Sequence, residues 1–290
     1  MKRLKKIYVE ITNVCNLRCP FCPPHSRAPS FMSVTDFRVL ISKIAGKADT
    51  LYFHVKGEPL LHPDLASLID IAGESGFAVH LTTNGTLLEN AGTSLSGKKN
   101  LNRINVSLHS LPQFEPAEQE RMARAILQAA EDIAAVNRAI NPKFLISLRL
   151  WTKDNLESTA NGLRIIEEFF HCRKGTIAGT LAEKNGCPVK DGIAIHAAET
   201  FVWPSLSGTD FGTAGFCHAL RDQAGILADG TVVPCCLDGD GIMTLGNAFE
   251  DEWDDIVGKG RASEIHDGFS NRKVVEPLCR RCGFRTRFGA

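Results

Sequence analysis

Up to about residue 203, short apolar runs alternate with longer amphipathic stretches. The apolar runs are bounded by polar or glycine positions, which is typical of buried strands. The longer stretches carry apolar residues at helical spacing, as Met122, Ile126 and Ile133 do in the longest of them. This pattern predicts strands over 7–12, 50–55, 77–82, 102–108, 143–150 and 193–196, and helices over 33–44, 62–75, 87–95, 115–140 and 155–170.

Strand and helix alternate six times with short connections, which predicts parallel βα units with right-handed crossovers. Partial closure of such units gives an α/β fold of the open (β/α)6 barrel type. In barrels of this kind the reactive groups gather at the carboxyl ends of the strands. We therefore look for functional residues just after each predicted strand.

The pattern changes near residue 205, where Ser205 to Gly215 is rich in glycine, serine and threonine. We predict a domain boundary here, with a barrel over 1–204 and a small, cysteine-rich α+β domain over 205–290. Two short apolar runs around Asp229-Gly230 predict a hairpin over 226–233. A helix is expected to begin near Glu252. Residues 173–191, rich in glycine and lysine, give no clear prediction.

Three of the ten cysteines, Cys15, Cys19 and Cys22, span eight residues in the loop that follows the first predicted strand. Thiolates on so short a loop can converge on one centre. Iron–sulfur clusters normally take four cysteine ligands, so a [4Fe–4S] cluster held by three would keep one iron open for a reacting molecule. A zinc site completed by a fourth ligand such as His25 is the alternative, as is a group of buried free thiols.

The Cys15-x3-Cys19-x2-Cys22 spacing, with Phe21 before the last cysteine, resembles the signature of the radical S-adenosylmethionine (SAM) superfamily. The resemblance implies a partial barrel, a [4Fe–4S] cluster and SAM bound to its open iron. It further implies one-electron cleavage of SAM to a 5'-deoxyadenosyl radical that abstracts hydrogen from a substrate. It places Phe21 against the adenine of SAM, and it implies a reductant partner such as flavodoxin or ferredoxin.

A second set of cysteines, Cys217, Cys235, Cys279 and Cys282, resembles the shortened SPASM ("twitch") domain. That resemblance implies one auxiliary [4Fe–4S] cluster, since the sequence supplies no further cysteines after Cys282. A zinc site with the same four ligands is the alternative. Cys236 should point away from the site because neighbouring strand side chains alternate faces, although an exchange of roles with Cys235 stays open.

The resemblance also suggests residues that contact SAM. Lys56-Gly57-Glu58-Pro59 resembles the superfamily's Gly-Gly-Glu motif, with lysine in place of the first glycine; a plain strand-to-helix turn is the alternative. Arg149 lies in an apolar strand and would need a carboxylate partner if buried, whereas a solvent-facing arginine would not. The cofactor-binding candidates on this reading are Phe21, Gly57, Glu58, Asn84, Ser107 and Arg149.

Histidines at the ends of predicted strands supply candidates for the catalytic role. His54, His109 and His196 could line a substrate cavity, together with Trp203. A lone histidine is more often a structural residue, so that alternative stays open for each. We identified no catalytic residue by sequence alone.

Composition limits the remaining possibilities. Lysine plus arginine equals aspartate plus glutamate, at 33 each, so the net charge argues against a nucleic-acid or membrane partner. The charged start is unlike a signal peptide, and no apolar run reaches the roughly 18 residues of a membrane span. We therefore expect a cytoplasmic protein with reduced thiols. The expected substrates are, in order, a peptide or protein side chain, a small alcohol or amino sugar, and an RNA base. A non-enzymatic cluster or zinc scaffold is the alternative function.

Overall fold

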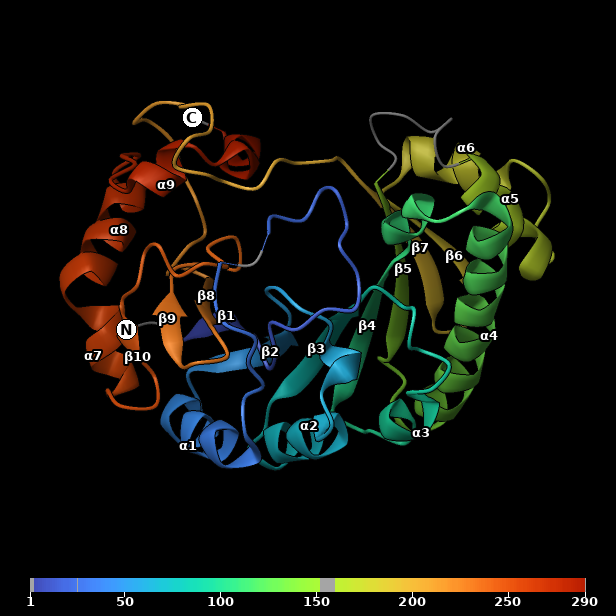
Figure 1. The fold of residues 1–290 in the computed structure, drawn as a ribbon, viewed down its shortest axis with the longest axis horizontal. Coiled ribbons are helices and arrows are strands. Elements are labelled where there is room, and N and C mark those ends of the chain that lie inside the picture. Colours follow the sequence, from blue (N-terminus) through green and yellow to red (C-terminus); the bar gives the residue numbers. More distant parts are fainter. Residues whose placement is uncertain (1–2, 25, 152–159, 290) are drawn as a thin grey trace. The chain divides into compact units, whose positions relative to one another are not determined.

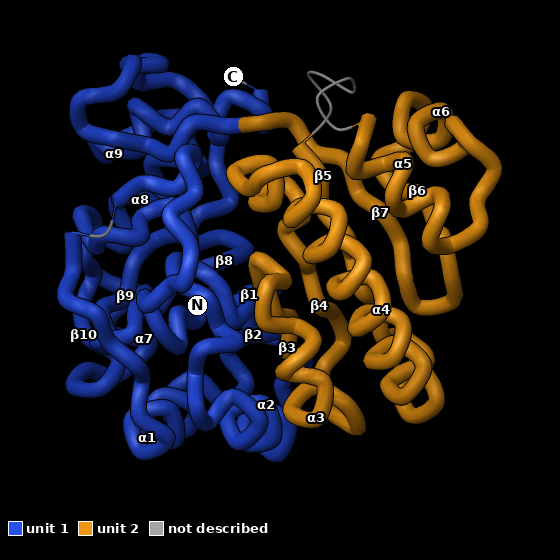
Figure 2. The backbone as a smooth tube through the Cα atoms, turned by 45° about the vertical axis from the view of Figure 1, so that its right-hand side comes forward, with its two compact units in different colours: residues 1–78, 201–290 blue, residues 79–200 orange. Residues whose placement is uncertain are grey.

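The computed structural model describes residues 3–24, 26–151 and 160–289. It separates into two compact units, which we describe one at a time (Figure 2). Unit 1 contains residues 1–78 and 201–290, and unit 2 contains residues 79–200. The C-terminal segment thus belongs to the same unit as the first two strands. The domain boundary near residue 205 stays a prediction.

Unit 1 is built on a mostly parallel set of strands. The C-terminal segment adds β8 to the free side of β1 in parallel register, with Tyr8 opposite Gly225. The hairpin predicted around Asp229-Gly230 is present as the antiparallel pair β8 and β9. In spatial order the strands are β10 (Gly246–Asn247), β9 (Thr231–Val233), β8 (Gln223–Ile226), β1 (Leu4–Val9) and β2 (Ala48–Phe53).

Helices cover one side of β1 and β2. Ser33 caps α1 by accepting a hydrogen bond from the Asp36 amide at 3.0 Å, as the sequence predicted. The apolar side of α1 packs on the sheet, where the Phe37 and Phe53 rings meet edge to face at 5.7 Å. The helical segments of this unit are α1 (Val34–Ile44), η1 (Pro59–Leu61), α2 (Leu65–Glu74), α7 (Trp253–Gly258), α8 (Gly260–Ser270), α9 (Pro277–Arg280) and η4 (Gly283–Phe288).

Unit 2 continues the strand–helix alternation. Its strands are, in spatial order, β3 (Ala78–Thr83), β4 (Leu101–Ser107), β5 (Leu145–Trp151), β7 (Ile193–Ala198) and β6 (Gly186–Lys190). All neighbours are parallel except β6, which runs antiparallel to β7 at the edge. The long helix α4 runs alongside the strands in Figure 1. The helical segments are α3 (Gly92–Leu95), η2 (Leu108–Gln113), α4 (Pro116–Ile140), α5 (Ala160–Phe169) and α6 (Thr176–Glu183).

The α/β class with parallel strands is confirmed, and each of the six predicted strands is present. The first strand begins at Leu4 and ends at Val9, three residues before its predicted end, because Thr12 already pairs with Phe31 across the following loop. The helix predicted over 87–95 is confined to α3, after a series of turns. Residues 173–191 form α6 and β6, which the sequence did not predict. The predicted start of α5 at Asn155, like His25, lies outside the described residues.

None of the helices in the described part of the chain has the length and apolar character needed to cross a membrane.

Candidate functional site

The three early cysteines lie in a loop whose two ends are fastened together. The Thr12 hydroxyl donates a hydrogen bond to the Ser30 carbonyl at 2.8 Å, and the Asn13 side chain donates to the Ala28 carbonyl at 2.8 Å and accepts from the Ser30 amide at 2.7 Å. Both Thr12 and Asn13 are buried. The loop is therefore closed at its base by local polar side chains, while its cysteines sit beyond the closure.

The three thiols are close enough to influence one another. Burial raises the pKa of Cys22, and the neighbouring Cys19 and Cys15 raise it further, whereas the charge of Lys56 opposes the rise. The Cys22 amide donates a hydrogen bond to the Cys19 carbonyl at 3.0 Å, which turns the chain between them. Phe21 is half-buried beside them. Three adjacent thiols are a donor set that suits an iron–sulfur cluster.

The segment Lys56-Gly57-Glu58 packs backbone to backbone on the start of this loop. Gly57 has a φ of +79°, and a Cβ there would lie 2.3 Å from the Thr12 carbonyl oxygen. The Glu58 amide donates a hydrogen bond to the Val14 carbonyl at 2.8 Å. The buried Glu58 carboxylate caps η1 by accepting from the Leu60 amide at 3.0 Å. The geometry requires glycine at position 57 because only glycine permits this close approach.

Three charged residues that the sequence did not connect lie around Lys56 of the same segment. The buried Glu10 carboxylate accepts a hydrogen bond from the Lys56 amide at 3.2 Å and is ion-paired with Arg27. The Lys56 ammonium pairs with Asp240 at 2.7 Å. The one signal of this network in the sequence is Lys56, which stands where the motif is expected to hold glycine.

In unit 2, three candidates occupy neighbouring positions on adjacent strands. Ser107 on β4 is in register with Arg149 on β5, which is in register with His196 on β7. They therefore share one face of the sheet. The Ser147 hydroxyl lies 2.8 Å from Nδ1 of His196. Asn84, after β3, uses its side-chain oxygen to accept hydrogen bonds from the amide and hydroxyl of Thr86.

The candidate histidines differ in their surroundings. The His109 ring stacks on Trp151 with ring centres 4.2 Å apart, and burial lowers its pKa to about 4. Burial also lowers the pKa of His196, helped by the charges of Arg103 and Arg149. His54 lies in unit 1, with its ring 6.0 Å from that of Tyr8. At neutral pH the rings of His109 and His196 are thus neutral, and each can accept or donate one proton.

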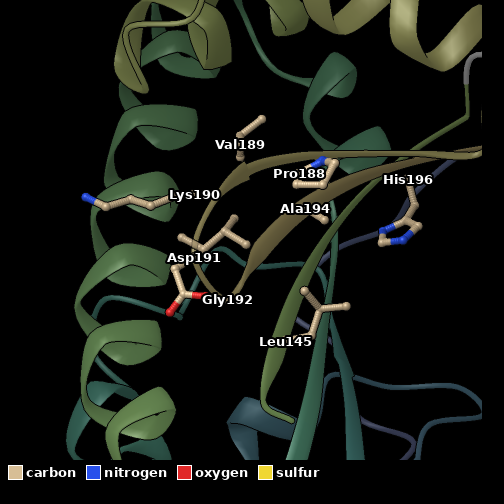
Figure 3. A pocket seen from close by; sticks show the side chains of 9 residues that line it. Leu145, Pro188, Val189, Lys190, Asp191, Gly192, Ala194 and His196 are labelled. Atoms are coloured by element: carbon tan, nitrogen blue, oxygen red, sulfur yellow. The ribbon is translucent and has the colours of Figure 1, made fainter. Parts of the chain in front are cut away.

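A pocket of about 580 Å³ lies at the edge of unit 2, between β5, β6 and β7 (Figure 3). Leu145, Pro188 and Ala194 line it, with His196 at one side. Lys190 and His196 point to opposite sides of it in Figure 3. His196 is the one candidate residue that contributes to this pocket.

The four later cysteines come together in unit 1. Burial raises the pKa of Cys235 well above its usual range, and the charges of Cys217 and Cys279 raise it further; Cys279 is affected in the same way by Cys217 and Cys282. These mutual effects connect all four predicted ligands. Four neighbouring thiols are a donor set that suits an iron–sulfur cluster.

Cys236 has a different polar partner from its neighbour. Burial raises its pKa to about 11, and its thiol is hydrogen-bonded to the Tyr8 hydroxyl. It packs at the cluster formed by Tyr8, Val55, Leu227 and Val233. This arrangement agrees with the alternation expected of adjacent residues, although it does not test which thiol is a ligand.

Arg285 and Asp238 hold the segments that carry these cysteines. The buried Arg285 guanidinium donates hydrogen bonds to the carbonyls of Cys279 at 3.1 Å and Ala214 at 2.7 Å, and to those of Phe211 and Gly212. The buried Asp238 carboxylate accepts from the amides of Ile242 and Met243. Sequence reasoning missed both, because neither lies in a recognisable motif.

Within residues 3–24, 26–151 and 160–289, no three His, Cys, Asp or Glu side chains are arranged to hold a single metal ion. In a four-iron cluster each thiolate binds a different iron atom, so its ligands need not meet at one point. Both donor sets consist of thiols, which are the ligands that such clusters take.

Comparison with known proteins matches two parts of the chain to families. Residues 9–144 match the Radical SAM superfamily, and residues 217–283 match SPASM, an iron–sulfur cluster-binding domain. The first match contains Cys15, Cys19 and Cys22, and the second contains Cys217, Cys235, Cys279 and Cys282.

One curated relative is a probable GTP 3',8-cyclase of Methanocaldococcus jannaschii, 35% identical over 115 residues, which is 38% of each chain. The chain therefore aligns with less than half of that protein. Among solved structures, BtrN in complex with AdoMet and 2-DOIA has a TM-score of 0.57 at 15% identity, covering 97% of this chain and 94% of BtrN.

SuiB of Streptococcus suis, solved with its precursor peptide SuiA, has a TM-score of 0.55 at 15% identity, covering 96% of this chain and 71% of SuiB. At these identities the structural likeness concerns the fold. The fold, the two cysteine sets and the two family matches agree: the chain belongs to the radical SAM superfamily and carries a C-terminal SPASM iron–sulfur domain.

Proposed function

We propose that the protein is a radical SAM enzyme that cleaves SAM reductively and uses the product radical to abstract hydrogen from a substrate. The observation that carries the proposal is the loop after β1, in which Cys15, Cys19 and Cys22 interact with one another beyond a closed base. The superfamily match includes this loop. The three cysteines would hold a [4Fe–4S] cluster and leave one iron for SAM.

The chain's own residues would position the cofactor. When bound, the cluster supplies the electron that splits SAM into methionine and a 5'-deoxyadenosyl radical. The loop is held in place by Thr12 and Asn13, and the backbone around Gly57 packs against it. Phe21 would contact the adenine. Gly57 and Glu58 would contribute backbone groups, and Asn84, Ser107 and Arg149 side chains, to binding SAM.

The auxiliary site would hold a second [4Fe–4S] cluster on Cys217, Cys235, Cys279 and Cys282, as in a shortened SPASM domain. With four protein ligands it would have no open iron, so we assign it to electron transfer. Cys217 acts on both Cys235 and Cys236, but we favour Cys235 as the ligand because Cys279 also acts on it, whereas the Cys236 thiol is hydrogen-bonded to Tyr8. A flavodoxin or ferredoxin would supply the electron for SAM cleavage.

The substrate is proposed only as a class. A peptide or protein side chain comes first, a small alcohol or amino sugar second and an RNA base third. Because one relative is named as a GTP cyclase and SuiB was solved with a peptide, we would include nucleotides and peptides among the compounds tested. His109 and His196 are candidates for proton transfer, because burial keeps both rings neutral at pH 7.

The test is anaerobic reconstitution with iron and sulfide, followed by incubation with SAM and dithionite. We expect about eight irons per chain and release of 5'-deoxyadenosine. Cys22→Ala should abolish release, and Cys279→Ala should halve the iron while the first cluster remains. Cys172→Ala, which changes a half-buried thiol outside both sets, serves as the control.

Release of 5'-deoxyadenosine should rise above its uncoupled rate when a compound of the right substrate class is added. Wild-type protein that binds iron but releases no 5'-deoxyadenosine would contradict the proposal and favour a non-enzymatic cluster scaffold. Binding of zinc in place of iron at the C-terminal site would contradict the auxiliary cluster alone.

A further inference from the structure

The lysine that replaces the expected glycine before Gly57 is almost completely buried. Its side chain is 1% exposed, and its ammonium lies 2.7 Å from Oδ1 of Asp240 and 3.2 Å from the carbonyl oxygen of Pro24. The lysine stem runs along the backbone of Gly239, where an added Cβ would come within 2.8 Å of its Cε. Lys56 therefore has one well-defined place, against the turn over residues 238–241.

Both ends of this contact belong to cysteine-bearing segments. Pro24 lies two residues after Cys22, and Asp240 lies four residues after Cys236. The Ser26 hydroxyl donates a hydrogen bond to the same Asp240 oxygen at 2.7 Å, and Arg27 donates to the Gly239 carbonyl at 3.0 Å. Lys56 and its partners thus join the segment after Cys22 to the turn after Cys236, within unit 1.

Glu10 completes the network at the end of β1. Its fully buried carboxylate pairs with Arg27 and accepts hydrogen bonds from the amides of Lys56 and Ala228, each at 3.2 Å. Two carboxylates and two cations therefore balance in charge. Because a buried ion pair seldom stabilises a fold more than apolar residues of the same shape would, stability alone does not account for these charges.

We propose that Lys56 is a positioning residue of the SAM-cluster site, which fixes the segment after Cys22 against the C-terminal turn and holds a cation beside the cluster. A nearby cation favours the reduced, more negative state of a cluster, and charge and hydrogen bonding around the cysteines tune cluster potentials. The effect of Lys56 on Cys22 agrees with this placement. The inference rests on the proposed function, since it concerns the cluster assigned there.

The inference predicts that removing either partner of the Lys56–Asp240 ion pair shifts the midpoint potential of the SAM cluster, and that the two shifts have opposite signs. Lys56→Met removes the cation and should move the midpoint potential of the SAM cluster to more negative values. Asp240→Asn leaves the cation in place without its partner and should move it to more positive values. Lys56→Arg should restore a potential close to that of the wild type. The auxiliary cluster should shift less than the SAM cluster in Lys56→Met.

The experiment is a redox titration of the reconstituted full chain, monitored by electron paramagnetic resonance, with iron content as the check on folding. Lys43→Met is the matched control, because Lys43 also bonds two carbonyls of the C-terminal segment, at Phe249 and Asp251, outside both cysteine segments. It should leave both potentials unchanged.

Shifts in the same direction for Lys56→Met and Asp240→Asn, or no shift beyond the control, would overturn the inference while leaving the proposed function intact. If Lys56→Met does not fold, the partly exposed Asp240→Asn decides by the sign of its shift. Failure of the wild-type chain to form any cluster on Cys15, Cys19 and Cys22 would remove the proposed function and this inference together.

Discussion

Replacing Gly57 by alanine should damage the cysteine loop more than the fold as a whole. Gly57 has a φ of +79°, where an L-residue costs about 1–2 kcal/mol, and its new Cβ would lie 2.3 Å from the Thr12 carbonyl oxygen and 2.9 Å from the Asn13 Cα. Both neighbours are backbone atoms at the base of the loop. They would have to move by about 1 Å to reach ordinary contact, and such overpacking costs a further 1–3 kcal/mol or so.

A second glycine allows the two costs to be separated. Gly76, after α2, has a φ of +83°, and a Cβ there would meet nothing within 4 Å. Gly76→Ala therefore carries the conformational cost without the clash. We expect it to lower the free energy of unfolding by about 1–2 kcal/mol and to leave the iron content unchanged. Gly57→Ala should lower the free energy of unfolding by a total of roughly 2–5 kcal/mol.

The assay combines anaerobic urea unfolding with iron analysis and measurement of SAM cleavage. Because the displaced atoms precede Cys15, Gly57→Ala should lose iron from the first cluster and retain the auxiliary cluster. Equal destabilisation of the two alanine variants, with full iron in both, would refute the close approach of Gly57 to the loop as the reason for glycine at that position.

Two further predictions concern His109 and Arg285. Burial lowers the pKa of His109 from the ordinary histidine value of 6.5 to about 4, so the unfolded chain binds a proton there more readily than the folded chain. The free energy of unfolding should therefore fall by at most about 3 kcal/mol as the pH drops from 6.5 to 4. Urea unfolding of His109→Asn should lose that part of the pH dependence, and a variant as pH-dependent as the wild type would contradict the lowered pKa. Arg285→Met leaves four carbonyls without their donor, so the free energy of unfolding should fall by roughly 3 kcal/mol or more and the auxiliary iron should be released. The control Arg287→Met, at an exposed site over the Phe284 ring, should retain the iron. Retention of auxiliary iron in both variants would contradict the role of Arg285.

The regular part of the fold follows from the sequence because its determinants are local. The apolar run around Ile7 and Val9 and the cap at Ser33 each specify one element without reference to the rest of the chain. The pairing of β8 with β1 does not have that property, because it joins residues more than 200 positions apart. Strand β6 was missed because residues 173–191 are rich in glycine and lysine and show no clear period. Pro188 lies within β6 and is accommodated because β6 is an edge strand.

In the candidate site, too, some residues could be predicted from the sequence and others could not. Spacing alone brings Cys15, Cys19 and Cys22 to one loop, and the register of adjacent strands places Ser107, Arg149 and His196 in one row. The side chains that support the cysteine segments could not be predicted. Arg285 and Asp238 are defined by which carbonyls and amides they meet after folding, and a sequence does not show those partners.

The pairing of β8 with β1 explains why one unit contains both cysteine sets. The amide of Glu10, at the end of β1, donates a hydrogen bond to the carbonyl of Ile226, at the end of β8. The first cysteine loop leaves one of these strands, and the hairpin that leads to Cys235 leaves the other. The register of this pair matters for the same reason, because a slip of β8 by one residue would reverse the faces of every side chain on that strand. Glu10, which bonds Arg27, Lys56 and Ala228 at that same position, would then lose the hydrogen bond from the Ala228 amide.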